Sequence, residues 1–508
     1  MRLSMPNWIP GIALATCLLL PQPSAADKTA VNTAANAGEW GNFEVGSAIV
    51  HLDLQVCVQA DGGRRLCPTG ITGEGRPMDV LLWYPADKQA YRTASPTVYS
   101  SRMNGMIIDR DHPDRWDPMS WTVTAERARD GVAVDHSGPS FPLIIHSHPG
   151  PGEPYDRAPT LERLASHGFI VIAPWHNRDT RDDERFDIIN QRAKKIILPR
   201  CLDGGSIPCL DGARKAVQNR ALDVAAILNN FEQPHGVLRS FFADRVDTDR
   251  VGLLGQSRGS VTALALAGGS TLWNIKAEPR IGAIMLLAIG TRTVTFSQDV
   301  HNVSVPSLLV AGKIDRNTPM QTSVDAFNMM PSRQKALVIL ERAEHGVYSS
   351  QRCAQMQAVG AIFQESWCRN PDNPRAVGEQ LTLESIMRSP NSGTPIDYCN
   401  YDSFTQPVDI RPTVFAMTGY AVTPTNVPRM LDTVTAMRLD LELANTFFDA
   451  TLVKQAQPGV HFKQYISPKF ELRKEGEAVS YEEAQSIKGR AVECDDADLV
   501  IDPACSEG

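Results

Sequence analysis

The pentapeptide Gly255-Gln-Ser257-Arg-Gly259 is the strongest chemical signal in the chain. It follows a short apolar run at 251–254, typical of a buried strand, and precedes a stretch at 260–266 with helical composition. A serine on such a tight turn has strained backbone torsions, and the small residues on either side let strand and helix approach each other. We therefore expect Ser257 to project beyond the carboxyl edge of a sheet as a nucleophile.

A serine hydroxyl needs a base that accepts its proton and a carboxylate that orients the base. For a serine on a strand-to-helix turn, the expected order along the chain is serine, acid, histidine. Asp315 follows the apolar run at 307–310, and His345 follows the run at 336–340 and precedes a glycine. We predict Asp315 as the acid and His345 as the base.

Other assignments need weighing, because the chain contains 11 histidines and 58 acidic residues. Asp299 follows the preceding predicted strand and is the alternative acid, and Asp315 has a purely structural alternative as a helix cap. Three further histidines end predicted strands but precede the serine, and we expect them to shape the pocket: His146, His148 and His176.

The oxyanion formed during attack on an acyl carbonyl needs two hydrogen-bond donors. The backbone N–H of Arg258, directly after the nucleophile, is the first predicted donor. The second is expected from the loop at 146–152, where the two prolines have no N–H. Gly150 is preferred and Gly152 is the alternative, unless the loop is only a rigid turn.

Apolar runs that alternate with helical stretches predict a doubly wound α/β fold with a mainly parallel sheet. Strands are expected at 142–145, 169–173, 251–254, 281–289, 307–310 and 336–340, with helices at 160–167, 215–231, 260–266 and 322–330. Before them, two β-rich stretches at 47–58 and 78–84 predict an antiparallel hairpin. The stretch at 86–140 has no clear periodicity, which favours a long excursion that contributes to a cap.

The N-terminus has the pattern of a secretory signal peptide. Arg2 precedes an apolar run at 9–20, and the small residues Ser24-Ala25-Ala26 suit a cleavage site. The run is too short for the roughly 20 residues that a membrane-spanning helix needs. Lipid attachment at Cys17 is an alternative.

After this signal at 1–26, we expect a flexible leader at 27–42, a catalytic domain at 43–470 and a C-terminal extension at 471–508. Candidate cap insertions lie at 86–140 and 370–430. Several bulky apolar residues in these insertions suggest an apolar acyl group or ordinary packing of the insert: Trp116, Met119, Trp121 and Tyr401.

Ten cysteines also fit export, because disulfides persist in oxidising compartments. Close pairs predict three local disulfides, with three further cysteines unresolved: Cys57 with Cys67, Cys201 with Cys209, and Cys494 with Cys505, besides Cys353, Cys368 and Cys399. No Cys-x-x-Cys pair occurs, so the spacing does not predict a zinc site or any other metal site. The acidic segment at 493–508 is either a disulfide-linked appendage or a disordered terminus.

Composition limits the partners. The net charge is −8, and no stretch concentrates basic residues, which argues against nucleic acid. No segment after the signal approaches about 18 uninterrupted apolar residues, so we expect no stable membrane insertion.

Four segments, in the same order, resemble the α/β-hydrolases related to platelet-activating-factor acetylhydrolase and dienelactone hydrolase: 141–148, 167–180, 219–224 and the serine pentapeptide. Cys353, Cys368 and a terminal helix at 437–452 are also similar to that group. The chain departs from its relatives at Gln256, where they commonly carry His, at Ser260, where they carry Gly, and at Pro149, where the loop usually has Gly.

The resemblance implies an α/β-hydrolase fold and hydrolysis of carboxylic esters without a cofactor. The predicted function is therefore an exported serine esterase with the triad Ser257, His345 and Asp315, acting on a small-molecule or polymeric ester. Two alternatives remain: an amide or peptide hydrolase with the same triad, and a catalytically silent binding protein with this fold.

Overall fold

A computed structural model of the chain describes residues 40–60, 62–103, 119–150, 152–177, 207–290, 300–312, 315, 318, 320–332, 334–340, 343, 345, 348, 408–409, 426–427, 433–453, 473–474, 477–478 and 490–494. The predicted signal peptide at 1–26 and nearly all of the leader at 27–42 lie outside these ranges.

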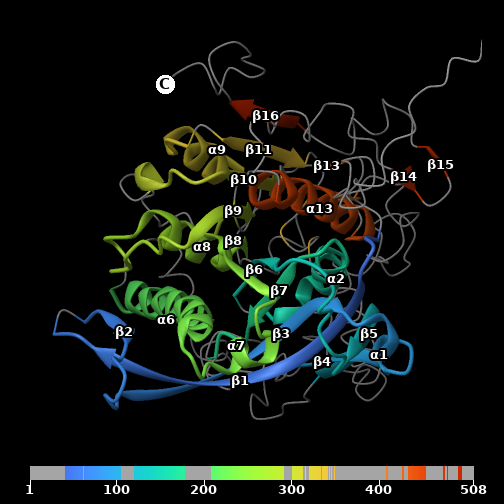
Figure 1. Cartoon of the computed structure of the whole chain (residues 1–508). Coiled ribbons are helices and arrows are strands. Elements are labelled where there is room, and N and C mark those ends of the chain that lie inside the picture. The colour runs from blue at the N-terminus through green and yellow to red at the C-terminus, as the bar shows by residue number, and fades with distance from the viewer. Residues whose placement is uncertain are drawn as a thin grey trace, which may run out of the picture.

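One large mixed sheet runs through the molecule (Figure 1). Its order is β16-β11-β10-β9-β8-β6-β7-β3-β1-β5-β4, and β2 pairs with β1 beside this path. The strands are β1 (Glu44–Val58), β2 (Arg64–Leu66), β3 (Glu74–Ala86), β4 (Pro96–Met103), β5 (Met119–Asp130), β6 (Phe141–Ser147), β7 (Ile170–Pro174), β8 (Val246–Gln256), β9 (Ile281–Leu287), β10 (Ser307–Gly312), β11 (Lys335–Leu340) and β16 (Arg490–Cys494).

The six strands from β6 to β11 pair only in parallel with one another, whereas β1 pairs with β3 and β3 pairs with β7 in antiparallel fashion. These pairings confirm the predicted parallel sheet with an N-terminal antiparallel hairpin. Parallel strands all end at one edge, so the segments after β6, β8, β10 and β11 lie on the same side of the molecule.

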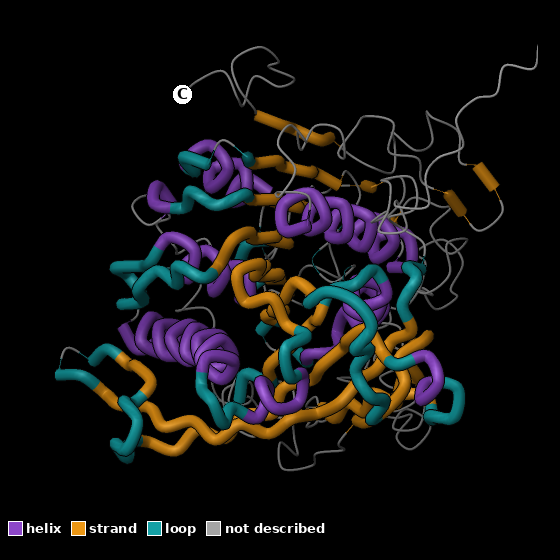
Figure 2. Tube along the Cα trace, viewed as in Figure 1, coloured by secondary structure: helices purple, strands orange, loops and turns teal. Residues whose placement is uncertain are grey.

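Helices cover both faces of the sheet (Figure 2). They are α1 (Lys88–Tyr91), α2 (Ala158–Ser166), α6 (Ile207–Glu232), α7 (Val237–Phe242), α8 (Arg258–Gly268), α9 (Met320–Met329) and α13 (Thr433–Phe448), with single turns η2 (Pro154–Arg157), η4 (Val300–Asn302) and η6 (Asp449–Val453). The helices predicted at 160–167, 215–231, 260–266 and 322–330 correspond to α2, α6, α8 and α9.

Alternate residues of each central strand contribute to two hydrophobic cores. Ile144 and Leu254 face a core that includes residues of α2 and α13, while Leu143 and Leu253 face a core that includes residues of α6, α7, α8 and α9. Because both faces of the strands are buried, the strands read as continuous apolar runs in the sequence.

For the described residues of the stretch 86–140, the expectation of an irregular excursion is wrong. Strands β4 and β5 pair with each other, and β5 extends the sheet beside β1. Tyr99 of β4 is buried, accepts a hydrogen bond from Trp83 Nε1 at 2.8 Å and donates to Glu162 of α2 at 2.9 Å. Long-range contacts of this kind stabilise the two strands, although the sequence of the stretch shows no clear alternation of polar and apolar residues. Residues 104–118, with Trp116, lie outside the described part, so the cap interpretation there stays a prediction.

The Cys57–Cys67 disulfide is present, with Cα atoms 5.1 Å apart across the β1–β2 turn. The other proposed cysteine pairs each include a side chain outside the described residues. In the C-terminal part, α13 and η6 correspond to the helix predicted at 437–452, and β16 pairs antiparallel with β11. The rest of the acidic tail and nearly all of 370–430 lie outside the described ranges.

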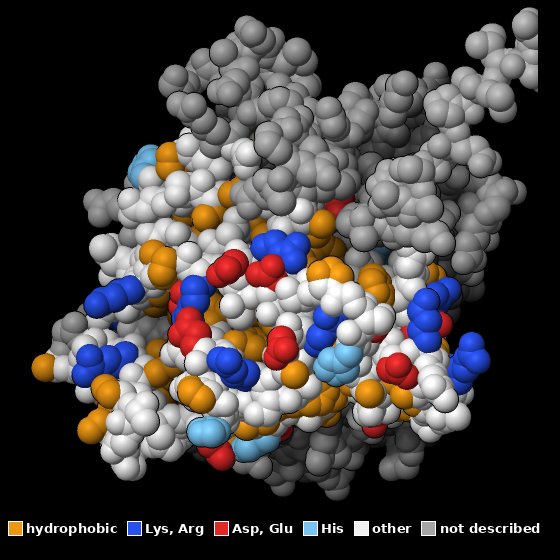
Figure 3. Space-filling model, in the orientation of Figure 1, with side chains coloured by type: hydrophobic (Ala, Val, Ile, Leu, Met, Phe, Trp, Pro, Cys, Tyr) orange, Lys and Arg blue, Asp and Glu red, His pale blue; other side chains and the backbone are white. Residues whose placement is uncertain are grey.

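Basic and acidic side chains are interspersed over the face seen in Figure 3, with no continuous basic surface among the described residues of that face. Among the described helices, none combines the length and the apolar character that crossing a bilayer requires.

Candidate active site

Ser257 occupies the turn between β8 and α8, with φ 54° and ψ −115°. A positive φ on a residue other than glycine costs on the order of 1–3 kcal/mol and persists only where its surroundings impose it. Here the Ser257 N–H donates to Leu287 O at 2.8 Å, and its carbonyl accepts from Gly290 N–H at 3.2 Å. The strained turn is therefore held against the end of β9.

The two glycines of the pentapeptide are sterically required. A Cβ on Gly255 would overlap the backbone of Gly259, and a Cβ on Gly259 would overlap the carbonyl of Ser147 at the end of β6. The motif spacing thus follows from the close approach of β8, α8 and β6.

The structure brings Ser257, His345 and Asp315 together. His345 Nε2 lies 3.2 Å from Ser257 Oγ, and its Nδ1 lies 2.8 Å from Asp315 Oδ2. Asp315 is buried at 2% exposure, whereas the His345 side chain retains 17%, so the base remains accessible from outside while the acid does not. The three predicted residues thus form one hydrogen-bonded chain, the arrangement expected of a nucleophile, its base and an orienting acid.

Thr318 belongs to the same group, although sequence reasoning did not assign it a role. Its N–H donates to Asp315 Oδ1 at 2.8 Å and its hydroxyl donates to Oδ2 at 2.6 Å. The same hydroxyl lies 3.1 Å from His345 Nδ1. Asp315 therefore accepts the local hydrogen bonds expected of a turn before α9 and also contacts the histidine. The interpretation of Asp315 as a helix cap and its interpretation as the acid are thus compatible. The Asp-x-x-Thr spacing was the available signal.

The alternative acid Asp299 lies outside the described residues. The three earlier histidines are fully buried, and their hydrogen bonds are with groups other than Ser257. Burial lowers the pKa of each imidazole well below its ordinary value, and nearby arginines lower it further, so all three are neutral: His146, His148 and His176.

The predicted oxyanion loop lies against the nucleophile turn. A Cβ on Gly150 would lie 2.6 Å from a guanidinium nitrogen of Arg258, the first residue of α8. A Cβ on Gly152 would instead meet Pro149 O and the carboxylate of Asp156, within its own segment. These contacts favour Gly150 over Gly152 as the second donor, and the assignment of both donors stays a prediction.

Arg220 and Asp223 of α6 are fully buried beside this loop. In the sequence, the segment 219–224 carries part of the family resemblance and has no assigned role. Two opposite charges one turn apart, directly before the apolar run at 224–228, were the signal for a buried polar network. Among the described residues, no group of three His, Cys, Asp or Glu side chains is arranged to hold a metal ion.

Residues 207–370 match the family model described as PET hydrolase-like. A search of curated proteins found no match. Among solved structures, a ferulic acid esterase from Streptomyces cinnamoneus is similar at 16% sequence identity, covering 82% of this chain and 92% of that chain with a TM-score of 0.42. The chain has the α/β-hydrolase fold, and the family match over 207–370 supports its assignment as a carboxylic ester hydrolase.

Proposed function

We propose that the chain is an exported serine hydrolase that cleaves carboxylic esters through an acyl-enzyme intermediate. The observation that carries this proposal is the hydrogen-bonded chain from Ser257 Oγ through His345 to Asp315, with the serine on a strained strand-to-helix turn.

In the proposed reaction, Ser257 Oγ attacks the ester carbonyl while His345 Nε2 accepts the hydroxyl proton. Asp315 stays ionised and holds Nδ1–H, which stabilises the imidazolium. His345 then donates the proton to the leaving alcohol, and the acyl group remains on Ser257. A water molecule, deprotonated by His345, releases the acid and restores the enzyme.

In this proposal, the backbone N–H groups of Arg258 and Gly150 donate hydrogen bonds that stabilise the developing oxyanion. Arg258 N–H lies at the N-terminus of α8, where the helix dipole favours negative charge. Loss of one such donor typically lowers kcat by about 100- to 1,000-fold.

The substrate is proposed to be a small-molecule or polymeric ester. The description of the matched family as PET hydrolase-like makes an aromatic polyester one member of the substrate series to test. Export is supported by the N-terminal pattern and by the Cys57–Cys67 disulfide, since such bonds form in oxidising compartments.

The test compares the mature protein with Ser257→Ala on p-nitrophenyl esters from acetate to a long-chain acid, on poly(ethylene terephthalate) film and on matched p-nitroanilides. Both proteins are also labelled with a fluorophosphonate. Ester turnover and labelling that disappear together in the variant support the proposal, and preferential cleavage of the anilides would instead indicate an amidase. A folded wild type that neither turns over nor labels would favour the binding protein.

A further inference from the structure

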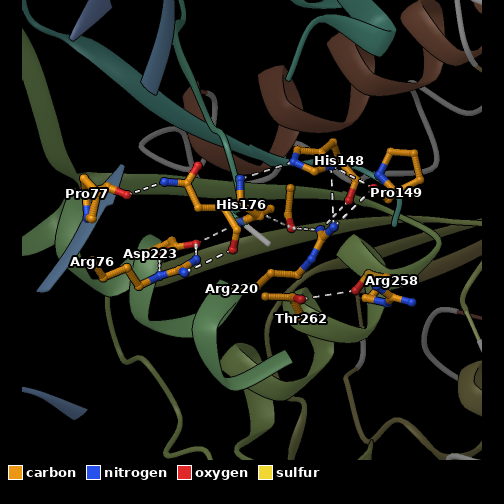
Figure 4. A network of polar contacts seen from close by, with 11 residues as sticks. Arg76, Pro77, His148, Pro149, His176, Arg220, Asp223, Arg258 and Thr262 are labelled. Atoms are coloured by element: carbon orange, nitrogen blue, oxygen red, sulfur yellow. Dashed lines mark hydrogen bonds and ion pairs between the residues drawn. The ribbon is translucent and has the colours of Figure 1, made fainter. Parts of the chain in front are cut away.

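We propose that Arg220 is the positioning residue of the oxyanion loop: from the interior, it fixes the peptide whose N–H is the second oxyanion donor. This inference rests on the proposed function and adds a residue that acts through Gly150 without touching the substrate. Figure 4 shows the polar network around it.

Arg220 donates to two consecutive carbonyls of the loop. Its Nη1 lies 2.5 Å from His148 O, and its Nη2 lies 3.2 Å from Pro149 O. His148 Nδ1 also lies 2.7 Å from Pro149 O. Arg220 is fully buried in α6, so these bonds form in a low-dielectric interior, where charge-assisted hydrogen bonds are strongest.

The carbonyl of Pro149 and the N–H of Gly150 belong to the same peptide plane. In a trans peptide these two groups point in opposite directions, so fixing the oxygen also fixes the direction of the N–H. Arg220 binds the oxygen from the interior, and the N–H of Gly150 is thereby directed to the other side of the peptide. The positive charge of Arg220 beside the carbonyl oxygen also polarises the amide, which strengthens its N–H as a donor.

A second set of residues fixes Arg220 and the loop in turn. Ser147 Oγ accepts from Arg220 at 3.2 Å and lies 2.9 Å from His176 Nε2. His176 Nδ1 lies 2.9 Å from Asp223 Oδ2, and Arg76 of β3 donates to both oxygens of Asp223 at 2.8 and 2.7 Å. The neutral imidazole therefore donates through Nδ1 to the carboxylate and accepts through Nε2 from the serine.

Ser147, His176 and Asp223 have the same connectivity as a hydrolytic triad, but the burial decides against a second catalytic centre. All three are fully buried, and Ser147 Oγ already accepts a hydrogen bond from Arg220. No substrate carbonyl reaches Oγ in this arrangement. The network therefore supports the loop at the end of β6 and performs no chemistry of its own.

The test measures transition-state binding separately from substrate binding in Arg220→Met and Arg220→Lys. For Arg220→Met we expect kcat per fluorophosphonate-titrated site to fall by about 10- to 100-fold. This decrease does not exceed the one expected when an oxyanion donor itself is removed. KM for p-nitrophenyl acetate stays within about twofold, because the donor acts mainly on the oxyanion. The affinity for an aryl trifluoromethyl ketone, whose adduct with serine carries the oxyanion, falls by the same factor as kcat. Arg220→Lys loses less, because it keeps the charge without the two-pronged geometry.

Arg214→Met is the matched control, since this arginine lies on the same helix but is exposed and donates to Leu272 O. It should retain the kcat and the ketone affinity of the wild type. If Arg220→Met does not fold, Arg220→Lys and Ser147→Ala supply the same comparison with milder changes. A variant with a lowered Tm but unchanged ketone affinity and unchanged kcat per titrated site would overturn the positioning role. A wild type without ester turnover would refute the proposed function itself, which is a different result.

Discussion

The Thr318 hydroxyl donates to Asp315 Oδ2 at 2.6 Å, the same carboxylate oxygen that lies 2.8 Å from His345 Nδ1. One oxygen of the buried acid thus serves both residues. The threonine fixes the plane of the carboxylate, and the carboxylate fixes the imidazole.

Replacing Thr318 by valine keeps the side-chain shape and removes this hydroxyl. We expect kcat to fall by about tenfold, because a hydrogen bond to a charged group contributes roughly 1.5–3 kcal/mol and only part of it is lost from the transition state. Thr318→Ser retains the hydroxyl and should retain most of the activity. Steady-state kinetics of the two variants on one ester are the measurement; equal losses in both would remove the hydroxyl from the explanation.

The identity of the acid is tested by comparing Asp315→Asn with Asp299→Asn. By analogy with established triads, Asp315→Asn should lower kcat by roughly 10⁴-fold, since an amide stabilises the wrong imidazole tautomer. Asp299→Asn should leave kcat near the wild-type value. The reverse pattern would move the acid to the alternative assigned from the sequence.

The glycines of the nucleophile turn should not tolerate a methyl group. Gly259→Ala places a Cβ into the carbonyl of Ser147, and we expect a loss of at least about 1–3 kcal/mol in the free energy of unfolding. Gly75→Ala is the matched control, because its nearest neighbour lies 4.0 Å from the added Cβ. Urea unfolding followed by circular dichroism gives both values, and equal stability of the two variants would contradict the packing argument.

The buried histidines predict a loss of stability in mild acid. Burial is the largest cause that lowers the pKa of His146, His148 and His176, so they stay neutral in the folded chain. In the unfolded chain they bind protons as the pH falls below about 6.5. The unfolded state then holds more protons than the folded state. The free energy of unfolding therefore decreases as the pH falls below about 6.5, by up to about 1.4 kcal/mol per pH unit for each histidine.

Urea unfolding between about pH 5 and pH 8 measures this slope. His176→Asn removes one of the titrating groups and should give a shallower decrease than the wild type. A stability that stays constant or rises as the pH falls from about 6.5 would show that these imidazoles accept protons in the folded state.

The ion pair between Arg157 and Asp440 links α13 to η2, the turn that follows β6, and both side chains are fully buried. Asp440→Ala leaves the guanidinium buried without this partner, and we expect a loss of about 3–5 kcal/mol in unfolding free energy. The double variant Arg157→Met, Asp440→Leu replaces both charges by apolar side chains and should recover most of that loss.

The exposed ion pair of Arg163 with Glu126 is the control for this experiment. Glu126→Ala should change stability by less than about 1 kcal/mol, because water screens the pair. Similar losses from Asp440→Ala and Glu126→Ala would mean that α13 does not depend on the buried pair.

Local patterns were sufficient for much of the architecture. The apolar runs predicted the central strands because both faces of a parallel strand are buried, and the pentapeptide predicted the turn at Ser257 because its constraints are local and steric. The close spacing of Cys57 and Cys67 likewise anticipated the disulfide.

Strands β4 and β5 escaped prediction because their stability comes from contacts such as those of Tyr99 with Trp83 and Glu162, which are distant in sequence. The roles of Thr318 and Arg220 were hidden for the same reason. A hydroxyl or a guanidinium acquires its function from the carboxylate or carbonyl that folding places beside it, and no local pattern encodes that neighbour. Residue types and their positions after predicted strands thus identified the candidate nucleophile, base and acid. Only the packing of α6 against the end of β6 determined which buried groups contact the predicted oxyanion loop.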